Sequence, residues 1–105
     1  MTEALPPEES RHRVPSLYDI AGRLEVELER TVGDAEAVLT AAQLGSFNQL
    51  LVDARAAVPD SVALREDVAE ADAATRPAEL YRALHTTIVP TLHNALPADE
   101  YRKRG

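Results

Sequence analysis

The stretch DAEAVLTAAQLGSFNQLLVDARAAV, residues 34–58, decides the fold, because it predicts a helix with apolar residues on two sides. Asp34 is a preferred N-cap residue, so the helix is expected to begin at the next position. Pro59 ends it, because the residue before a proline is pushed out of the helical region. The sequence therefore predicts one helix over residues 35–58.

Two capping-box patterns inside this stretch give a competing prediction. Thr40-x-x-Gln43 and Ser46-x-x-Gln49 each place a hydroxyl residue three positions before a glutamine. This arrangement closes the N-terminus of a helix, because each side chain bonds the backbone of the other residue. A helix that starts at the second pattern would break the stretch near Gly45.

The predicted helix has a main apolar face and a second seam on its far side. The main face contains Leu39, Leu44, Phe47, Leu50, Leu51, Ala54 and Val58. The seam contains Val38, Ala41, Gly45, Asn48 and Val52, at the spacings of a coiled-coil contact. Both faces need a covering partner, so this helix is expected at the centre of the molecule.

Three further helices are predicted around it. Ser16 is the expected N-cap of a helix over residues 16–32, a short helix is expected over residues 61–74, and Pro77 begins a helix over residues 77–96. Their apolar positions are Leu17, Ile20, Ala21, Leu24, Leu28 and Val32 in the first, Leu64, Val68 and Ala71 in the second, and Leu80, Tyr81, Leu84, Ile88, Val89, Leu92, Ala95 and Leu96 in the third. Each helix therefore has an apolar stripe to bury.

We predict an all-α fold, a four-helix and mostly antiparallel bundle over residues 15–98. Residues 1–14 are rich in Pro and polar side chains and are expected to form a disordered arm. Residues 99–105 form a basic tail. Pro90 lies inside the last helix, where it removes an amide donor and its ring clashes with the preceding turn, so a kink is expected there.

The composition narrows the class of protein. The 105 residues include no Cys and carry a formal net charge of −7. The lack of Cys excludes a disulfide framework and a thiol nucleophile. The negative charge disfavours binding to nucleic acid or to an anionic membrane, because phosphate groups are repelled. No stretch approaches the roughly 20 apolar residues of a membrane-spanning helix, so we expect a cytoplasmic protein, without a cofactor.

His85, Thr86 and His93 form a candidate polar site beside the proline of the last helix. In a regular helix, eight residues place the two imidazoles roughly 80° apart around the axis and two turns apart along it, unlike the i, i+4 pair of an HExxH zinc site. His85 is also expected within the apolar arc. A packed histidine is therefore favoured, and a small ligand or metal site at the kink is the third reading of the function.

A degenerate helix-turn-helix over residues 34–55 is the second reading. Its turn would lie at Gly45, and Asn48 and Gln49 would read adenine from the following helix. That helix contains Arg55 as its one basic residue. Contacts to bases and phosphates usually use several basic side chains, so DNA binding is disfavoured.

The favoured reading is a non-catalytic helical protein–protein interaction module, an accessory or scaffold subunit without enzymatic activity. A symmetric dimer would cover the second seam, because a two-fold interface is self-complementary, and another helical protein is the alternative partner. Asn48 would then set the register against its own copy. Coverage of the seam by residues 61–74 or by the arm is the alternative. The acidic residues 60–74 also offer a surface to a basic protein partner.

Overall fold

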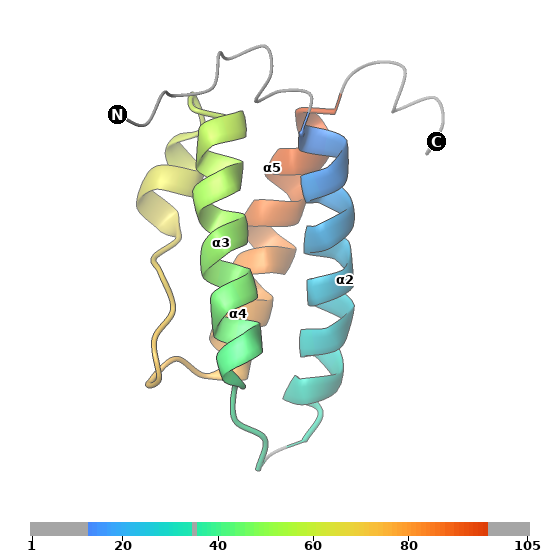
Figure 1. Cartoon of the computed structure of the whole chain (residues 1–105), viewed down its shortest axis with the longest axis vertical. Coiled ribbons are helices and arrows are strands. Elements are labelled where there is room, and N and C mark those ends of the chain that lie inside the picture. Colours follow the sequence, from blue (N-terminus) through green and yellow to red (C-terminus); the bar gives the residue numbers. More distant parts are fainter. Residues whose placement is uncertain (1–12, 35, 97–105) are drawn as a thin grey trace.

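The computed structural model describes residues 13–34 and 36–96, and most of them are helical (Figure 1). The elements in order are α2 (Val14–Val32), α3 (Ala41–Ala57), η1 (Ala63–Asp67), α4 (Pro77–Ala83), η2 (Leu84–Ile88) and α5 (Val89–Asn94), where η denotes a π-helical segment. These described ranges contain no strand, which confirms the all-α prediction for them. Residues 1–12 of the predicted arm and the whole predicted tail, residues 99–105, lie outside the described residues.

Three helical rods lie side by side in Figure 1, namely α2, α3 and the continuous rod made by α4, η2 and α5. In this view α2 descends from its first residue, whereas α3 and the last rod both ascend. Residues 58–76, which we call the strap, return the chain along the side of α3 to the lower end of the molecule. No helix in the described residues is long and apolar enough to cross a membrane.

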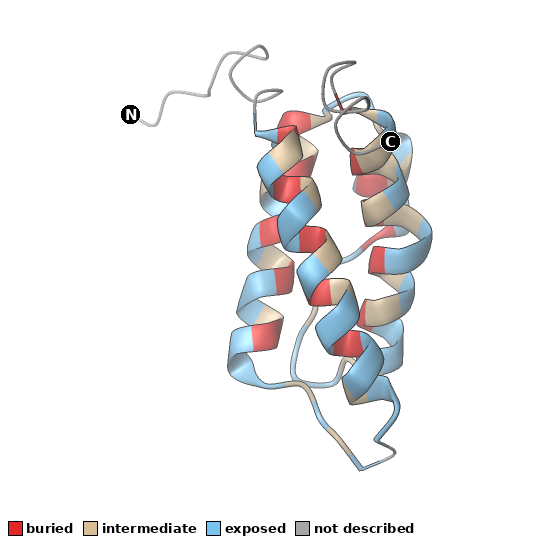
Figure 2. Cartoon of the chain, turned by 90° about the vertical axis from the view of Figure 1, so that its right-hand side faces the viewer, coloured by how far each residue is buried: buried red, intermediate tan, exposed pale blue. Residues whose placement is uncertain are grey.

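The buried side chains form one core between the rods, and Figure 2 shows them on the facing sides of the helices. Its members are Val14, Leu17, Ala21, Leu24, Leu28, Phe47, Leu50, Leu51, Ala54, Ala57, Leu64, Val68, Leu80, Leu84, Ile88, Leu92 and Leu96. The predicted stripes therefore meet in the core. Ile20 and Val32 are exceptions, because they lie at the edges of the α2 stripe and remain 43% and 40% exposed.

α2 begins two residues earlier than predicted. The amide of Leu17 donates to the carbonyl of Arg13 at 2.9 Å, which closes a turn ahead of Ser16. Pro15 fits this first turn because its missing amide would have no partner there. Val14 is fully buried, so the additional turn extends the core.

α3 begins six residues later than predicted, at Ala41. Thr40 and Gln43 form a complete capping box, with bonds of 3.0 Å and 2.9 Å between each side chain and the other's amide. Asp34 instead closes a turn, because its carboxylate accepts from the amide of Glu36 at 3.0 Å. The helix continues without a break through Gly45. Residues 34–55 therefore do not form a helix-turn-helix.

The strap replaces the predicted third helix with one helical turn and an extended segment. Leu64 lies in the π-helical turn η1 and is fully buried. Val68 follows it with φ −123° and ψ 125°, which is extended backbone, and is 4% exposed. The two apolar residues are buried as the sequence indicates, but the helix ends between them.

The last rod accommodates Pro90 by a change of hydrogen-bond register. The amide of Val89 donates to the carbonyl of Leu84, five residues earlier, so the segment before the proline is π-helical. Glu79 supports the start of the rod, because its carboxylate accepts from the amide of Arg76 at 3.0 Å. The disturbance predicted at Pro90 therefore takes the form of a π segment, a feature often found at functional sites.

Candidate interaction surface

α3 turns one side to the core, one side to the strap and one side to the surroundings. Ala41, Gly45 and Val52 share the third side, which we call the outer face of α3. Val52 is 50% exposed, and a Cβ built on Gly45 meets no atom within 4 Å. The outer face is therefore a strip of small and aliphatic residues without a covering element in the described part of the chain.

The other two residues of the predicted seam differ from these three. Val38 precedes α3 in an extended segment and is 79% exposed. Asn48 lies at the edge of the outer face, between Gly45 and Val52, and its side chain bonds both backbone groups of Ala71, so the strap covers the seam at this point. The structure thus keeps three of the five seam residues on one surface, and Asn48 is engaged within the chain.

A hollow of about 330 Å³ lies beside the outer face, in the groove between α2 and α3. It is lined by Leu17, Ile20, Gly45, Ser46, Gln49, Leu50 and Asp53. Gly45 opens the hollow because it has no side chain, and Ile20 forms its opposite wall. At the upper end, Arg13 pairs with Asp53 at 3.3 Å. The groove is mainly aliphatic with polar groups at its rim.

Gln43 connects α3 to α2 and is a structural residue that the apolar pattern does not reveal. It is 7% exposed, and its side-chain amide donates to Glu27 and to the hydroxyl of Thr31, each at 3.3 Å. Because the same side chain completes the cap with Thr40, one residue fixes both the start of α3 and its place against α2. The capping-box pattern is the sequence signal for it.

The candidate polar site does not converge on one point. The ring of His85 lies 3.1 Å from a carboxylate oxygen of Glu25, and the ring of His93 lies 5.5 Å from that of Tyr18. Thr86 donates to the carbonyl of Arg82 at 2.6 Å instead. The side chain of His85 is 60% exposed, which corrects its predicted place within the apolar arc.

The π segment explains where the histidines lie. His85 and His93 both contact α2, at residues that are seven positions apart, or two regular turns. Eight residues of the last rod span the same two turns because the π segment takes up one extra residue. The two imidazoles therefore lie on the same side of the last rod, without the angle between them that a regular helix would give. They remain two turns apart along its axis.

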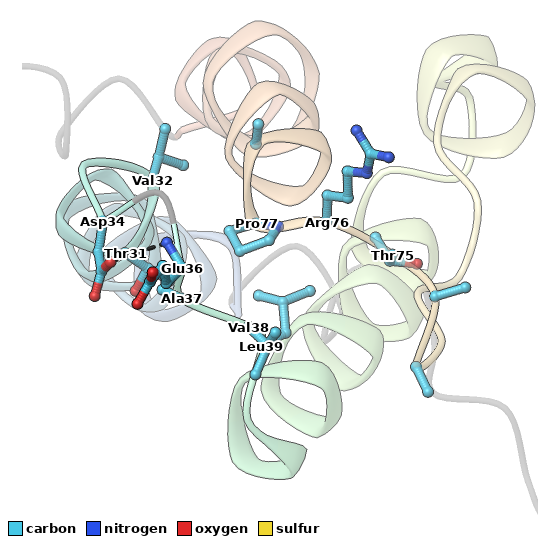
Figure 3. A pocket seen from close by; sticks show the side chains of 13 residues that line it. Thr31, Val32, Asp34, Glu36, Ala37, Val38, Leu39, Thr75, Arg76 and Pro77 are labelled. Atoms are coloured by element: carbon cyan, nitrogen blue, oxygen red, sulfur yellow. Dashed lines mark hydrogen bonds between the residues drawn. The ribbon is translucent and has the colours of Figure 1, made fainter.

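A second hollow, of about 470 Å³, lies at the lower end of the molecule (Figure 3). Figure 3 shows it between the α2–α3 connection, with Asp34 and Glu36, and the end of the strap at Thr75 and Arg76. No group of three or more His, Asp or Glu side chains in the described residues is placed to hold a metal ion. Neither hollow therefore comes with a metal-binding constellation in the described ranges.

Comparison with known proteins gives no match: no family model, no curated protein and no solved structure matches this chain. The chain's own surfaces are therefore the basis for a functional proposal. Exposed apolar side chains lie beside three hollows in the described part of the chain: Ile20 lines the groove next to the outer face of α3, Val32 and Val38 line the hollow at the lower end, and Val26 lines one on α2.

Proposed function

We propose that this protein is a non-catalytic interaction module, a mostly antiparallel helical bundle that pairs with a second copy of itself through the outer face of α3. The observation that supports this proposal is the half-exposed Val52 beside the hollow at Gly45. The role that follows is that of a cytoplasmic accessory or scaffold subunit. Its activity is to hold two copies together.

The outer face has the shape that a two-fold contact needs. Val52 is a ridge, and the groove between α2 and α3 is a hollow on the same surface. A two-fold axis places the ridge of each copy against the hollow of the other, because the same patch serves both subunits. Ala41 and Gly45 have small or absent side chains, which allows the two helices to approach closely.

The contact must extend beyond α3. A stable interface buries about 1,200–2,000 Å² in total, which is more than one short helical strip supplies. Ile20 across the groove and Val38 before the helix are both exposed on described segments that flank the outer face. Burial of these side chains in the dimer stabilises it through the hydrophobic effect. Asn48 takes no part in the pairing, because it is bonded to Ala71.

Analytical ultracentrifugation tests the proposal. The wild-type chain is expected to show a concentration-dependent monomer–dimer equilibrium. Val52→Asp is expected to sediment as a monomer, because a carboxylate in the contact would lose its hydration. Val62→Asp is the matched control, since Val62 is 53% exposed on the strap, and this variant is expected to dimerise normally.

Circular dichroism of both variants shows whether they remain folded. The proposal is wrong if the wild type is monomeric at every concentration, or if the two aspartate variants have the same association constant.

A further inference from the structure

The first described residue of the chain is tied to the edge of the groove between α2 and α3. The side chain of Arg13 pairs with that of Asp53 in α3 at 3.3 Å, and its carbonyl accepts from the amide of Leu17 at 2.9 Å. The side chain of Asp53 is 19% exposed and lines the hollow of about 330 Å³ beside Gly45. Residues 1–12 therefore join the fold at the rim of this hollow.

The chain before Arg13 is long enough to reach every part of the hollow. The residues of α3 that line it extend from Gly45 to Asp53, which is about 12 Å along the helix axis. Leu5 lies eight positions before Arg13 and is followed by a pair of prolines. Eight residues span about 25 Å in the polyproline II conformation, which such a pair favours. Leu5 can therefore reach any point of the hollow while Arg13 keeps its place.

The chemistry of the hollow fits this segment. Its wall on α2 includes Ile20, which is 43% exposed, and residues 5–7 of the segment are a leucine and two prolines. A polyproline II segment has no internal hydrogen bonds, so its carbonyls accept from neighbouring groups. The hydroxyl of Ser46 and the amide of Gln49 line the hollow and supply donors of this kind.

We propose that residues 1–12 bind the groove between α2 and α3 and compete there with the second copy of the chain. This inference rests on the dimer proposed above and adds a regulator of that contact. Leu5 and the two prolines cover Ile20 and the hollow, and the ion pair between Arg13 and Asp53 fixes where the segment enters the groove. The ridge of the second copy needs the same aliphatic surface, so the two occupants exclude one another.

Competition within the chain sets the affinity of the dimer. A segment attached at the rim of its own site has an effective concentration in the millimolar range, which favours it over a second copy that diffuses from solution. Each copy must release its own segment before the two can pair. If the segment is bound in about nine chains of ten, the association constant falls about a hundredfold, because the competent fraction enters once for each copy.

Sedimentation of full-length variants tests the competition. Leu5→Asp is expected to raise the association constant of the dimer about ten- to hundredfold, because a carboxylate in the aliphatic hollow would lose its hydration and the segment would leave the groove. Thr2→Asp is the matched control, since it adds the same charge outside the apolar run, and it is expected to associate as the wild type does. Equal constants for the two aspartate variants would overturn the proposal.

An intramolecular disulfide tests the location of the segment without reference to the dimer. At a dilution where the chain is monomeric, mild oxidation of Leu5→Cys with Ser46→Cys is expected to link the two positions within one chain. The control combines Leu5→Cys with Arg23→Cys, because Arg23 is exposed within one turn of Ile20 and lines the other hollow of α2, with Val26. Mass spectrometry of digested monomer measures both yields. Equal yields, or a link that forms only between two chains, would overturn the proposal.

The dimer and its regulation fail in different ways. If the wild type dimerises and Leu5→Asp and Thr2→Asp associate equally, the dimer stands and the competition is wrong. A lower association constant for Leu5→Asp also overturns the competition, because the segment would then strengthen the contact between the copies. If no variant dimerises, both proposals are wrong, whatever the yield of the intramolecular disulfide.

Discussion

The strap and the last rod use the same local pattern with different results. Each contains a π-helical segment, η1 in the strap and η2 in the rod, and each buries aliphatic residues four positions apart. The rod continues as a helix on both sides of η2, whereas the strap becomes extended directly after η1. The difference lies in the number of anchors, because the rod and the turn directly after it bury five such residues and the strap buries two.

A spacing of four residues does not fit a regular α-helix. Each step of four residues advances by about 40° beyond one full turn, so five anchors drift by about 160° around the axis. Leu80, Leu84, Ile88 and Leu92 of the rod follow this spacing, Leu96 continues it just beyond α5, and all five are buried. The π segment takes up the drift because its turn contains more residues. The wider π-helical turn is therefore kept in the rod, because it allows the aliphatic residues before and after η2 to remain buried.

In the strap, the burial of apolar side chains does not favour a helix beyond Val68. After Val68 the chain carries Glu70 and Asp72, both exposed, so no further helical turn would bury apolar surface. Backbone order costs about 1–2 kcal/mol per residue, which such a turn would not recover. The extended backbone there is held instead by Asn48 and Arg55.

Truncation of one buried aliphatic residue in each region tests the comparison. Ile88 is fully buried, so Ile88→Ala is expected to lower the free energy of unfolding by about 2–5 kcal/mol. Val68→Ala removes fewer carbons beside a hollow and is expected to cost about 1–2 kcal/mol. Urea denaturation followed by circular dichroism measures both values. Equal losses would show that the strap is as firmly packed as the rod.

The periodicity of apolar residues predicts the helical class and most of the core. Of the main face predicted for α3, Phe47, Leu50, Leu51 and Ala54 are buried as expected. Pro59 also ends α3 within one residue of the predicted position. These features are local or follow from burial, and for this reason they can be read from one sequence.

The first residue of a helix is harder to predict when two nearby residues can both serve as its N-cap. Asp34 and Thr40 are both good N-caps, and Thr40 prevails because Gln43 completes the box and also bonds α2. The sequence cannot show that second contact, which joins residues 16 positions apart. The orientation of Asn48 likewise depends on the strap, so its place in the predicted seam could not be checked by spacing alone.

Deletion of one residue from η2 sharpens the argument about spacing, and its expected effect is small. Without Thr86 the five anchors are separated by 4, 3, 4 and 4 residues, which places them within an arc of about 80° on a regular α-helix. Combined with Pro90→Ala, which restores the amide, this deletion is expected to change the free energy of unfolding by less than about 2 kcal/mol.

Deletion of Arg23 is the matched control, because α2 has regular α-helical spacing. It rotates the following Leu24 and Leu28 by about 100° away from the core, so a loss of roughly 4–10 kcal/mol or a failure to fold is expected. Thermal unfolding of the two purified variants separates the outcomes. If both deletions are equally damaging, the spacing argument for η2 is wrong.

A cysteine placed on the outer face of α3 tests self-association through this face, because the chain has no Cys of its own. Gly45 lies near the middle of the strip, and Glu29 is an exposed control position on α2. Under mild oxidation at equal concentrations, Gly45→Cys is expected to give a disulfide-linked dimer in much higher yield than Glu29→Cys. Equal yields from the two variants, on a non-reducing gel, would contradict the account.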